Sequence, residues 1–292
     1  MQKHTTKVVH ALLAASLLLA PSLTAQGDPA GPEAFSVVQE EFEAASRDWM
    51  TSYRAASKDG ASREELSALM AKRPSAKDYL ARIRAIIRAD AAGEDAGAAA
   101  AWLVTRGRVT GAELGYALDV LASHHMGSPH VTAVMPMLSR NPAPAVTTFL
   151  GKATARAEGD DLAMALMTSA EQLKSAAGTA RTLAAGTEED LERYAGFYGK
   201  EAVDVLRTAD ADLLEERSAK LFERLTADES LGAVGYRRKT IGEAAASALF
   251  ELKNLSVGKV APDIVGEDLD GTPMKLSDYR GKVVVLDFWG DW

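Results

Sequence analysis

Apolar side chains recur every three or four positions through most of the chain. Three such series are Phe35, Val38, Phe42, Ala45, Trp49 and Tyr53; then Tyr79, Ile83, Ile86 and Ile87; then Leu191, Tyr194, Tyr198, Ala202 and Val205. This spacing places the side chains on one face of an α-helix, where they pack against neighbouring elements. The pattern predicts that residues 33–255 form a domain that is helical almost throughout.

Helix start and stop signals divide this stretch into short helices. The segments Ser62–Glu65, Thr110–Glu113 and Thr240–Glu243 match the capping box, in which a hydroxyl and a carboxylate bind free amides at a helix start. Expected breaks lie at Gly93, Gly127–Pro129, Asn141–Pro144, Gly159, Gly178 and Gly186. Short helices with short connections predict a helical-hairpin bundle or an irregular α-solenoid.

The pattern changes after Leu255, and residues 256–292 are expected to form a separate segment. Two short strands, within 264–269 and 272–276, flank an Asp270-Gly271 turn, which predicts a β-hairpin. Leu276–Tyr279 resembles a single helical turn. The run Val283–Trp289 is nearly continuous apolar, which is typical of a strand buried on both faces. The predicted fold is therefore mainly α, followed by an incomplete α/β segment.

The first residues predict a secretory signal peptide, residues 1–25. Lys3 and Lys7 precede the apolar run Val8–Leu19, and Ala25 offers a small residue at a cleavage point. A short membrane anchor is the alternative, but the run is shorter than the ~20 residues that a spanning helix needs. Residues 26–32 read as a spacer. We expect a soluble periplasmic or extracytoplasmic protein, without stable membrane insertion after cleavage.

Charge and composition limit the classes of partner that we expect the protein to bind. The 292 residues carry 41 acidic and 33 basic side chains, for a net charge of −8, and no block of basic residues occurs. This balance argues against binding to nucleic acid or to an anionic membrane. The chain contains no cysteine.

Three histidines lie close together in the sequence, at His124, His125 and His130. Close histidines can bind a metal ion, but no cysteine and no suitably spaced carboxylate accompanies them. They flank the Gly127–Pro129 loop signal, so a solvated loop is the favoured interpretation. We expect no metal and no cofactor.

Three motifs near the end of the chain carry a family resemblance. Gly258-Lys-Val-Ala-Pro-Asp-Ile264, Asp268-Leu-Asp-Gly271 and the run from Leu276 to Trp292 resemble the start of the redoxin families of the thioredoxin-like superfamily. These are the alkyl hydroperoxide reductase/thiol-specific antioxidant proteins and the TlpA-like thiol-disulfide reductases. The resemblance covers about an eighth of the chain.

The resemblance implies a reaction and roles for three residues. In these families Phe-Trp-x-x-Trp precedes Cys-x-x-Cys, whose first thiolate attacks a disulfide and whose second cysteine resolves the mixed disulfide. Asp287 matches a buried acid that exchanges a proton with the resolving cysteine, and burial would raise its pKa; the alternative is a surface aspartate at a strand end. Trp289 and Trp292 would flank the pair, with plain packing as the alternative.

The nucleophile itself is missing from the sequence, which ends where the first cysteine is expected. Three explanations stay open: a UGA codon for selenocysteine read as a stop, a real nonsense codon, or the end of a sequenced contig. Without a cysteine or selenocysteine the 292 residues cannot carry out the exchange.

Two functions remain as expectations. The first is an exported thiol-disulfide oxidoreductase or peroxiredoxin-like antioxidant, with protein disulfides or peroxides as substrates and an external reductant as partner. Its helical domain would bind a protein partner or set the oligomeric state. The alternative is a non-catalytic helical binding or scaffold protein with a vestigial redoxin tail.

Overall fold

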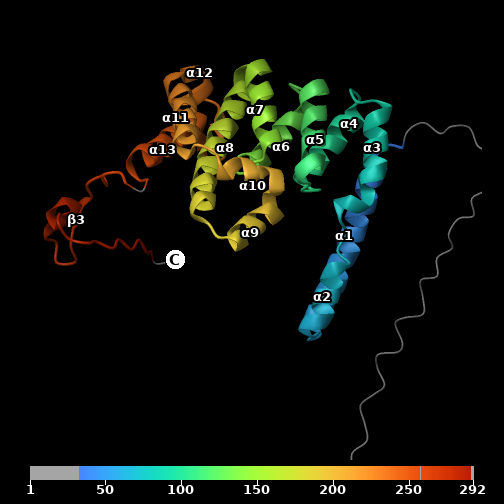
Figure 1. The fold of residues 1–292 in the computed structure, drawn as a ribbon, viewed down its shortest axis with the longest axis horizontal. Coiled ribbons are helices and arrows are strands. Elements are labelled where there is room, and N and C mark those ends of the chain that lie inside the picture. Colours follow the sequence, from blue (N-terminus) through green and yellow to red (C-terminus); the bar gives the residue numbers. More distant parts are fainter. Residues whose placement is uncertain (1–32, 257, 291–292) are drawn as a thin grey trace, which may run out of the picture. The chain divides into compact units, whose positions relative to one another are not determined.

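Helices make up most of the structure, as the periodicity predicts (Figure 1). They are α1 (Phe35–Lys58), α2 (Arg63–Ala71), α3 (Leu80–Ala89), α4 (Glu94–Thr105), α5 (Gly111–His124), α6 (Pro129–Leu138), α7 (Pro144–Arg156), α8 (Gly159–Ala185), α9 (Glu188–Tyr198), α10 (Lys200–Arg207), α11 (Ala211–Ala227), α12 (Glu229–Gly232) and α13 (Ile241–Asn254). Single 3-10 turns occur at Ala76–Tyr79 and Leu276–Tyr279. The strands are β1 (Gly235–Tyr236), β2 (Lys239–Thr240), β3 (Val265–Glu267) and β4 (Pro273–Lys275), which pair as two antiparallel hairpins, β1–β2 and β3–β4.

This computed structural model describes residues 33–256 and 258–290. The predicted signal peptide and spacer, residues 1–32, lie outside the described residues, as does Trp292. Within the described part of the chain, no helix has the length and apolar character needed to cross a membrane.

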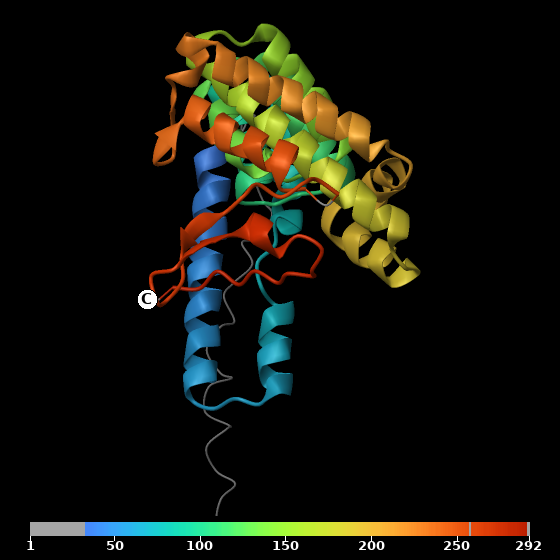
Figure 2. The same ribbon diagram turned by 90° about the vertical axis from the view of Figure 1, so that its left-hand side faces the viewer.

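The first two helices form a helical hairpin (Figure 2). The indole Nε1 of Trp49 in α1 donates a hydrogen bond to the carbonyl oxygen of Leu69 in α2, at 2.8 Å. The other end of α1 enters the main core, where Phe35 and Val38 are buried. Phe42 packs edge-on against Trp102 of α4, with ring centroids 4.9 Å apart. The apolar face predicted for this helix is thereby confirmed.

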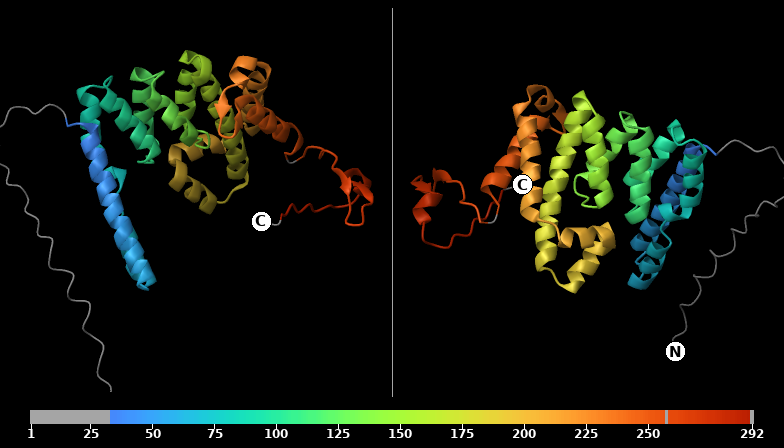
Figure 3. Two further views of the ribbon diagram at one scale, coloured as in Figure 1. Left: turned by 180° about the vertical axis from the view of Figure 1, so that it is seen from behind. Right: turned by 45° about the horizontal axis from the view of Figure 1, so that its top comes forward.

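Three clusters of buried apolar side chains hold the helices together. The first lies mainly among α1 and α3–α7, around residues such as Leu103, Leu121 and Phe149, and it also includes Ala165 of α8. The second joins α8 to α11, α12 and α13, and the third joins α8 to α10. Helix α8 contributes to all three clusters and lies against α7 and α11 (Figure 3). At 27 residues it is about 40 Å long, given a rise of about 1.5 Å per residue.

Local signals near helix ends are confirmed in part. The capping boxes at Ser62–Glu65 and Thr240–Glu243 are formed, with both reciprocal hydrogen bonds. The box predicted at Thr110–Glu113 is wrong. Helix α5 does begin after Thr110, but the threonine side chain caps no amide. The Glu113 carboxylate instead pairs with the Arg84 guanidinium, at 2.5 and 3.2 Å.

Two further predictions about breaks are wrong. Gly178 does not interrupt the chain, because α8 continues through it to Ala185. The apolar series that begins at Leu191 was expected to be one helix, but Gly199 separates α9 from α10. Its φ of 90° lies in the region that L side chains rarely adopt, so the helix ends there.

Candidate functional site

The predicted β-hairpin of the C-terminal segment is present. Strands β3 and β4 pair in antiparallel register, with Val265 opposite Lys275 and Glu267 opposite Pro273. In the connecting turn, the Asp268 carboxylate accepts hydrogen bonds from the amides of Asp270 and Thr272, at 2.9 and 2.8 Å. An aspartate that binds amides in this way stabilises a tight turn. The expected helical turn follows as the 3-10 turn Leu276–Tyr279.

A second aspartate fixes the start of this 3-10 turn. The Asp263 carboxylate accepts hydrogen bonds from both the amide and the hydroxyl of Ser277, each at 2.8 Å. These bonds, the backbone amide first, lower the pKa of Asp263. The Leu276 amide also donates to the Ile264 carbonyl oxygen, at 2.9 Å. The sequence did not predict these hydrogen bonds, because Asp263 and Ser277 lie fourteen positions apart and no local rule connects them.

The run Val283–Trp289 differs from its prediction. It forms no β-ladder and is exposed, so the expected buried strand is wrong for this structure. Exposure nevertheless alternates: Val283 and Val285 are 97% and 88% exposed, whereas Val284 and Leu286 are 41% and 50% exposed. This period of two is that of an extended chain. Val284 and Leu286 line a cavity of about 360 Å³, which Asp263 and Ser277 also line.

The residues expected to act in redox chemistry lie on this extended run. Asp287 is exposed, so the burial expected for its carboxylate does not occur here. Trp289 is 85% exposed, and Trp292 lies outside the described residues. A strand becomes buried only when neighbouring strands and covering helices pack on it, and the described residues provide neither for this run. The roles of Asp287, Trp289 and Trp292 remain predictions.

The histidines form a packed cluster, and the solvated-loop prediction is wrong for two of them. His125 is buried, and its Nε2 donates to the Ala91 carbonyl oxygen at 2.9 Å. His130 Nε2 lies 2.9 Å from the Glu94 carboxylate, and its ring packs edge-on against that of His125. His124 is exposed. Among the described residues no group of histidines and carboxylates is placed to hold a metal ion.

Part of the chain is similar to proteins named thiol-disulfide oxidoreductase ResA. It is 45% identical to the Geobacillus kaustophilus protein over 62 residues, which are 21% of this chain and 32% of that protein. The relative from Geobacillus thermodenitrificans is 49% identical over 47 residues, 16% of this chain and 27% of that protein. The Bacillus subtilis relative is 47% identical over 47 residues, 16% of this chain and 26% of that protein.

These matches support a thioredoxin-like redoxin family for part of the chain. The chain spans between a quarter and a third of the length of these relatives. No family model matches the sequence, and no solved structure matches it. The similarity agrees with the family resemblance of the C-terminal motifs.

Proposed function

We propose that this chain is part of an exported thiol-disulfide oxidoreductase, and that residues 256–292 open its thioredoxin-like domain. The observation that carries the proposal is the 45–49% identity to proteins named thiol-disulfide oxidoreductase. The same name favours protein disulfides over peroxides as substrates. The hairpin and the turn after it support the proposal, since both are formed by residues within the motifs that carry the resemblance.

The chemistry requires groups beyond those in the sequence. A thiolate or selenolate attacks one sulfur of the substrate disulfide and releases the other as a thiolate. A second thiolate then resolves the mixed disulfide, and an external dithiol returns the two electrons. None of the 292 residues is a cysteine, so the reactive pair would come from residues that these 292 do not include. In this scheme Asp287 exchanges the proton of the resolving thiol, and Trp289 and Trp292 flank the pair.

The extended run has the side-chain pattern that joining a sheet requires. Pairing with neighbouring strands, together with helices packed on the faces of the sheet, would cover Val283 and Val285, which are now almost fully exposed. Burial of one such valine from water is worth roughly 1.5–3 kcal/mol. The same packing would bury Asp287, the group that the proposal assigns to proton exchange with the resolving thiol.

The proposal is tested on the protein isolated from the cells that make it. Insulin disulfide reduction is measured with dithiothreitol as reductant, alongside consumption of hydrogen peroxide. We expect insulin reduction that iodoacetamide abolishes, whereas the recombinant 292-residue chain gives only the background rate. An isolated protein that is inactive towards insulin refutes the proposal. Peroxide consumption without insulin reduction would replace it with the peroxidase alternative.

Export is tested separately by cell fractionation and by sequencing the mature N-terminus. We expect the protein outside the cytoplasm, with Gln26 as its first residue. A cytoplasmic protein that retains Met1 would contradict this part of the proposal and leave the redox part standing.

The second candidate, a non-catalytic helical binding protein, is favoured by the helical region itself. Its three buried clusters are formed by residues between Phe35 and Leu252. A chain ending at Leu255 would then keep its helical circular dichroism and its binding partner. The redox proposal places the reactive groups beyond that point, so a chain ending at Leu255 would give no insulin reduction above background.

A further inference from the structure

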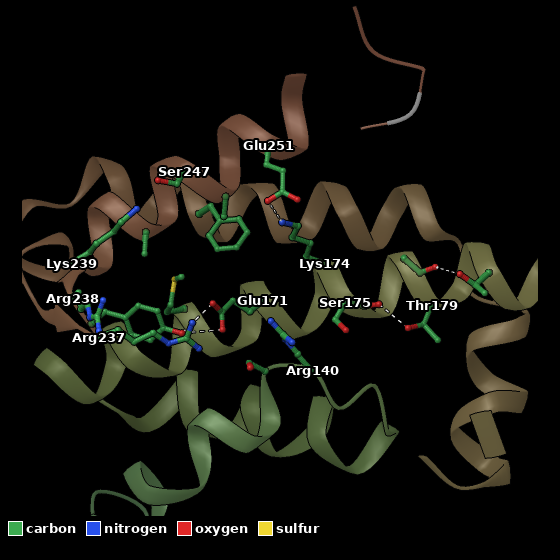
Figure 4. Close-up of a pocket in the computed structure, with 18 of the residues that line it drawn as sticks. Arg140, Glu171, Lys174, Ser175, Thr179, Arg237, Arg238, Lys239, Ser247 and Glu251 are labelled. Carbon is green, nitrogen blue, oxygen red and sulfur yellow. Dashed lines mark hydrogen bonds and ion pairs between the residues drawn. The ribbon is translucent and has the colours of Figure 1, made fainter. Parts of the chain in front are cut away.

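A long groove runs along helix α8 and is closed on its other side by α13 and the β1–β2 hairpin (Figure 4). Its cavity measures about 910 Å³, and the buried side chains of Met167 and Phe222 form its floor. The residues that α8 contributes recur every three or four positions from Met167 to Thr182. At about 1.5 Å per residue, this face is about 22 Å long. A groove of this length suits an elongated occupant.

Cationic side chains gather at one end of the groove. Arg237, Arg238 and Lys239 lie together around the β1–β2 turn (Figure 4), and Arg140 follows α6. In the described part of the chain, none of these four is in an ion pair with a carboxylate. The whole chain, by contrast, has a net charge of −8. A patch of unpaired cations on an acidic protein favours an anionic partner.

The two carboxylates that line the groove are already engaged. Glu171 accepts the hydroxyl hydrogen bond of Tyr236, at 3.1 Å to each carboxylate oxygen. Glu251 pairs with Lys174 at 2.6 Å. With Lys174 included, the groove is lined by five cationic side chains and by only these two carboxylates, so its lining has a net positive charge. Guanidinium groups bind carboxylates through two parallel hydrogen bonds, which makes arginines well suited to recognising acidic side chains.

The middle of the groove is lined by small residues. Gly178 is exposed in the interior of α8, and a Cβ built on it would meet nothing within 4 Å. Glycine costs roughly 1 kcal/mol relative to alanine in a helix interior, and no packing in the structure requires it here. Across the groove stand Ala244, Ser247 and Ala248 of α13. Small residues on both walls allow the backbone of an occupant to approach closely.

We propose that this groove binds a peptide segment of a partner protein, with acidic side chains at one end and small or apolar side chains along the rest. The acidic end lies against Arg140, Arg237 and Arg238, and the remainder lies over Gly178. An extended segment of about seven residues matches the length of the groove, at about 3.3 Å per residue. This inference concerns the helical region and does not depend on the redox proposal.

The probe is a fluorescein-labelled peptide of about seven residues, with glutamates at one end and alanine and leucine at the other. Its binding to the full 292-residue chain is followed by fluorescence anisotropy, at low and at high salt. We expect saturable binding that weakens as salt rises, because salt screens exposed charges. A peptide with lysines in place of the glutamates serves as the charge control and should not bind.

Two kinds of variant separate the contribution of charge to peptide binding from the contribution of the shape of the groove. Arg237→Gln with Arg238→Gln should weaken binding at least tenfold, whereas Arg54→Gln with Arg88→Gln removes the same charge from exposed sites outside the groove and should change little. Gly178→Leu fills the groove without changing charge and should also weaken binding at least tenfold. Its helical circular dichroism should be retained, since leucine is a better helix former than glycine.

Three outcomes would overturn the inference. They are no saturable binding of the glutamate peptide, equal losses in the two double variants, and full binding by Gly178→Leu. Full displacement by millimolar inorganic phosphate, combined with an unaffected Gly178→Leu variant, would assign the cations to a small anion instead of a peptide.

Discussion

Two glycines in helix interiors should respond to the same substitution with opposite signs. Gly97 lies in α4 and Gly178 in α8, and both are flanked by helical residues. A Cβ at Gly178 meets open space. A Cβ at Gly97 would lie 2.5 Å from Cδ2 of His130 and 2.8 Å from Nδ1 of His125. Alanine therefore adds only helix propensity at Gly178, whereas at Gly97 it adds both helix propensity and a steric clash.

The magnitudes follow from these surroundings. Replacing an interior helix glycine by alanine gains roughly 0.5–1 kcal/mol of stability, so Gly178→Ala should stabilise the protein by that amount. Gly97→Ala gains the same, but overpacking a filled site costs roughly 1–3 kcal/mol. The His125 ring cannot move aside freely, because its Nε2 is bonded to Ala91. The free energies of unfolding of the two variants should therefore differ by about 1–3 kcal/mol.

Urea unfolding followed by circular dichroism measures this difference, with the free energy extrapolated linearly to water. We expect the midpoint to rise for Gly178→Ala and to fall for Gly97→Ala, with an unchanged slope. Midpoints that move together by the same amount would refute the packed histidine cluster. A destabilised Gly178→Ala would refute the open groove at that position.

Two further predictions concern single side chains. Burial and the neighbouring Glu171 carboxylate raise the pKa of Tyr236 to about 12 from its ordinary 10, so the stability from this group is complete below pH 10 and is lost as the pH rises through 12. Tyr236→Phe should remove the step near pH 12 from the tyrosinate absorbance titration, and a curve that keeps this step would contradict the assignment. Thr240→Ala removes a formed capping box and should cost about 1 kcal/mol in urea unfolding. Thr110→Ala, where the side chain caps nothing, should change stability by less than about 0.5 kcal/mol, and equal losses would count against the caps as described.

Sequence patterns predicted the structural features that depend only on residues close together in the chain. The helical series beginning at Phe35 and the Asp270-Gly271 hairpin are both confirmed, because each needs only local periodicity or turn chemistry. The capping box at Thr110 failed for a tertiary reason. Its Glu113 carboxylate has a nearby guanidinium from another helix, and an ion pair with two hydrogen bonds displaces the local bond.

Features that depend on distant neighbours could not be predicted. The sequence predicted a helix break at Gly178, but the packing of α8 against α7 and α11 overrides the poor helix propensity of this glycine. The sequence predicted a solvated loop for His125 and His130, because nothing local shows that α4 packs against them. The groove joins Arg140 to the turn at Arg237, almost a hundred positions later, and only the fold brings them together. Val283–Trp289 has a strand sequence, but pairing needs partner strands as well as propensity.

The position of α8 in all three clusters has a consequence for cooperativity. Ala165, Leu166 and Leu183 of this one helix are buried in different clusters, so α8 cannot open without exposing apolar surface in each. Its central amides should therefore exchange hydrogen only through global unfolding, at a rate shared with the cores on either side. An occupant of the groove lies directly on this helix. Its binding would slow exchange throughout the helical region, including in helices that it never touches.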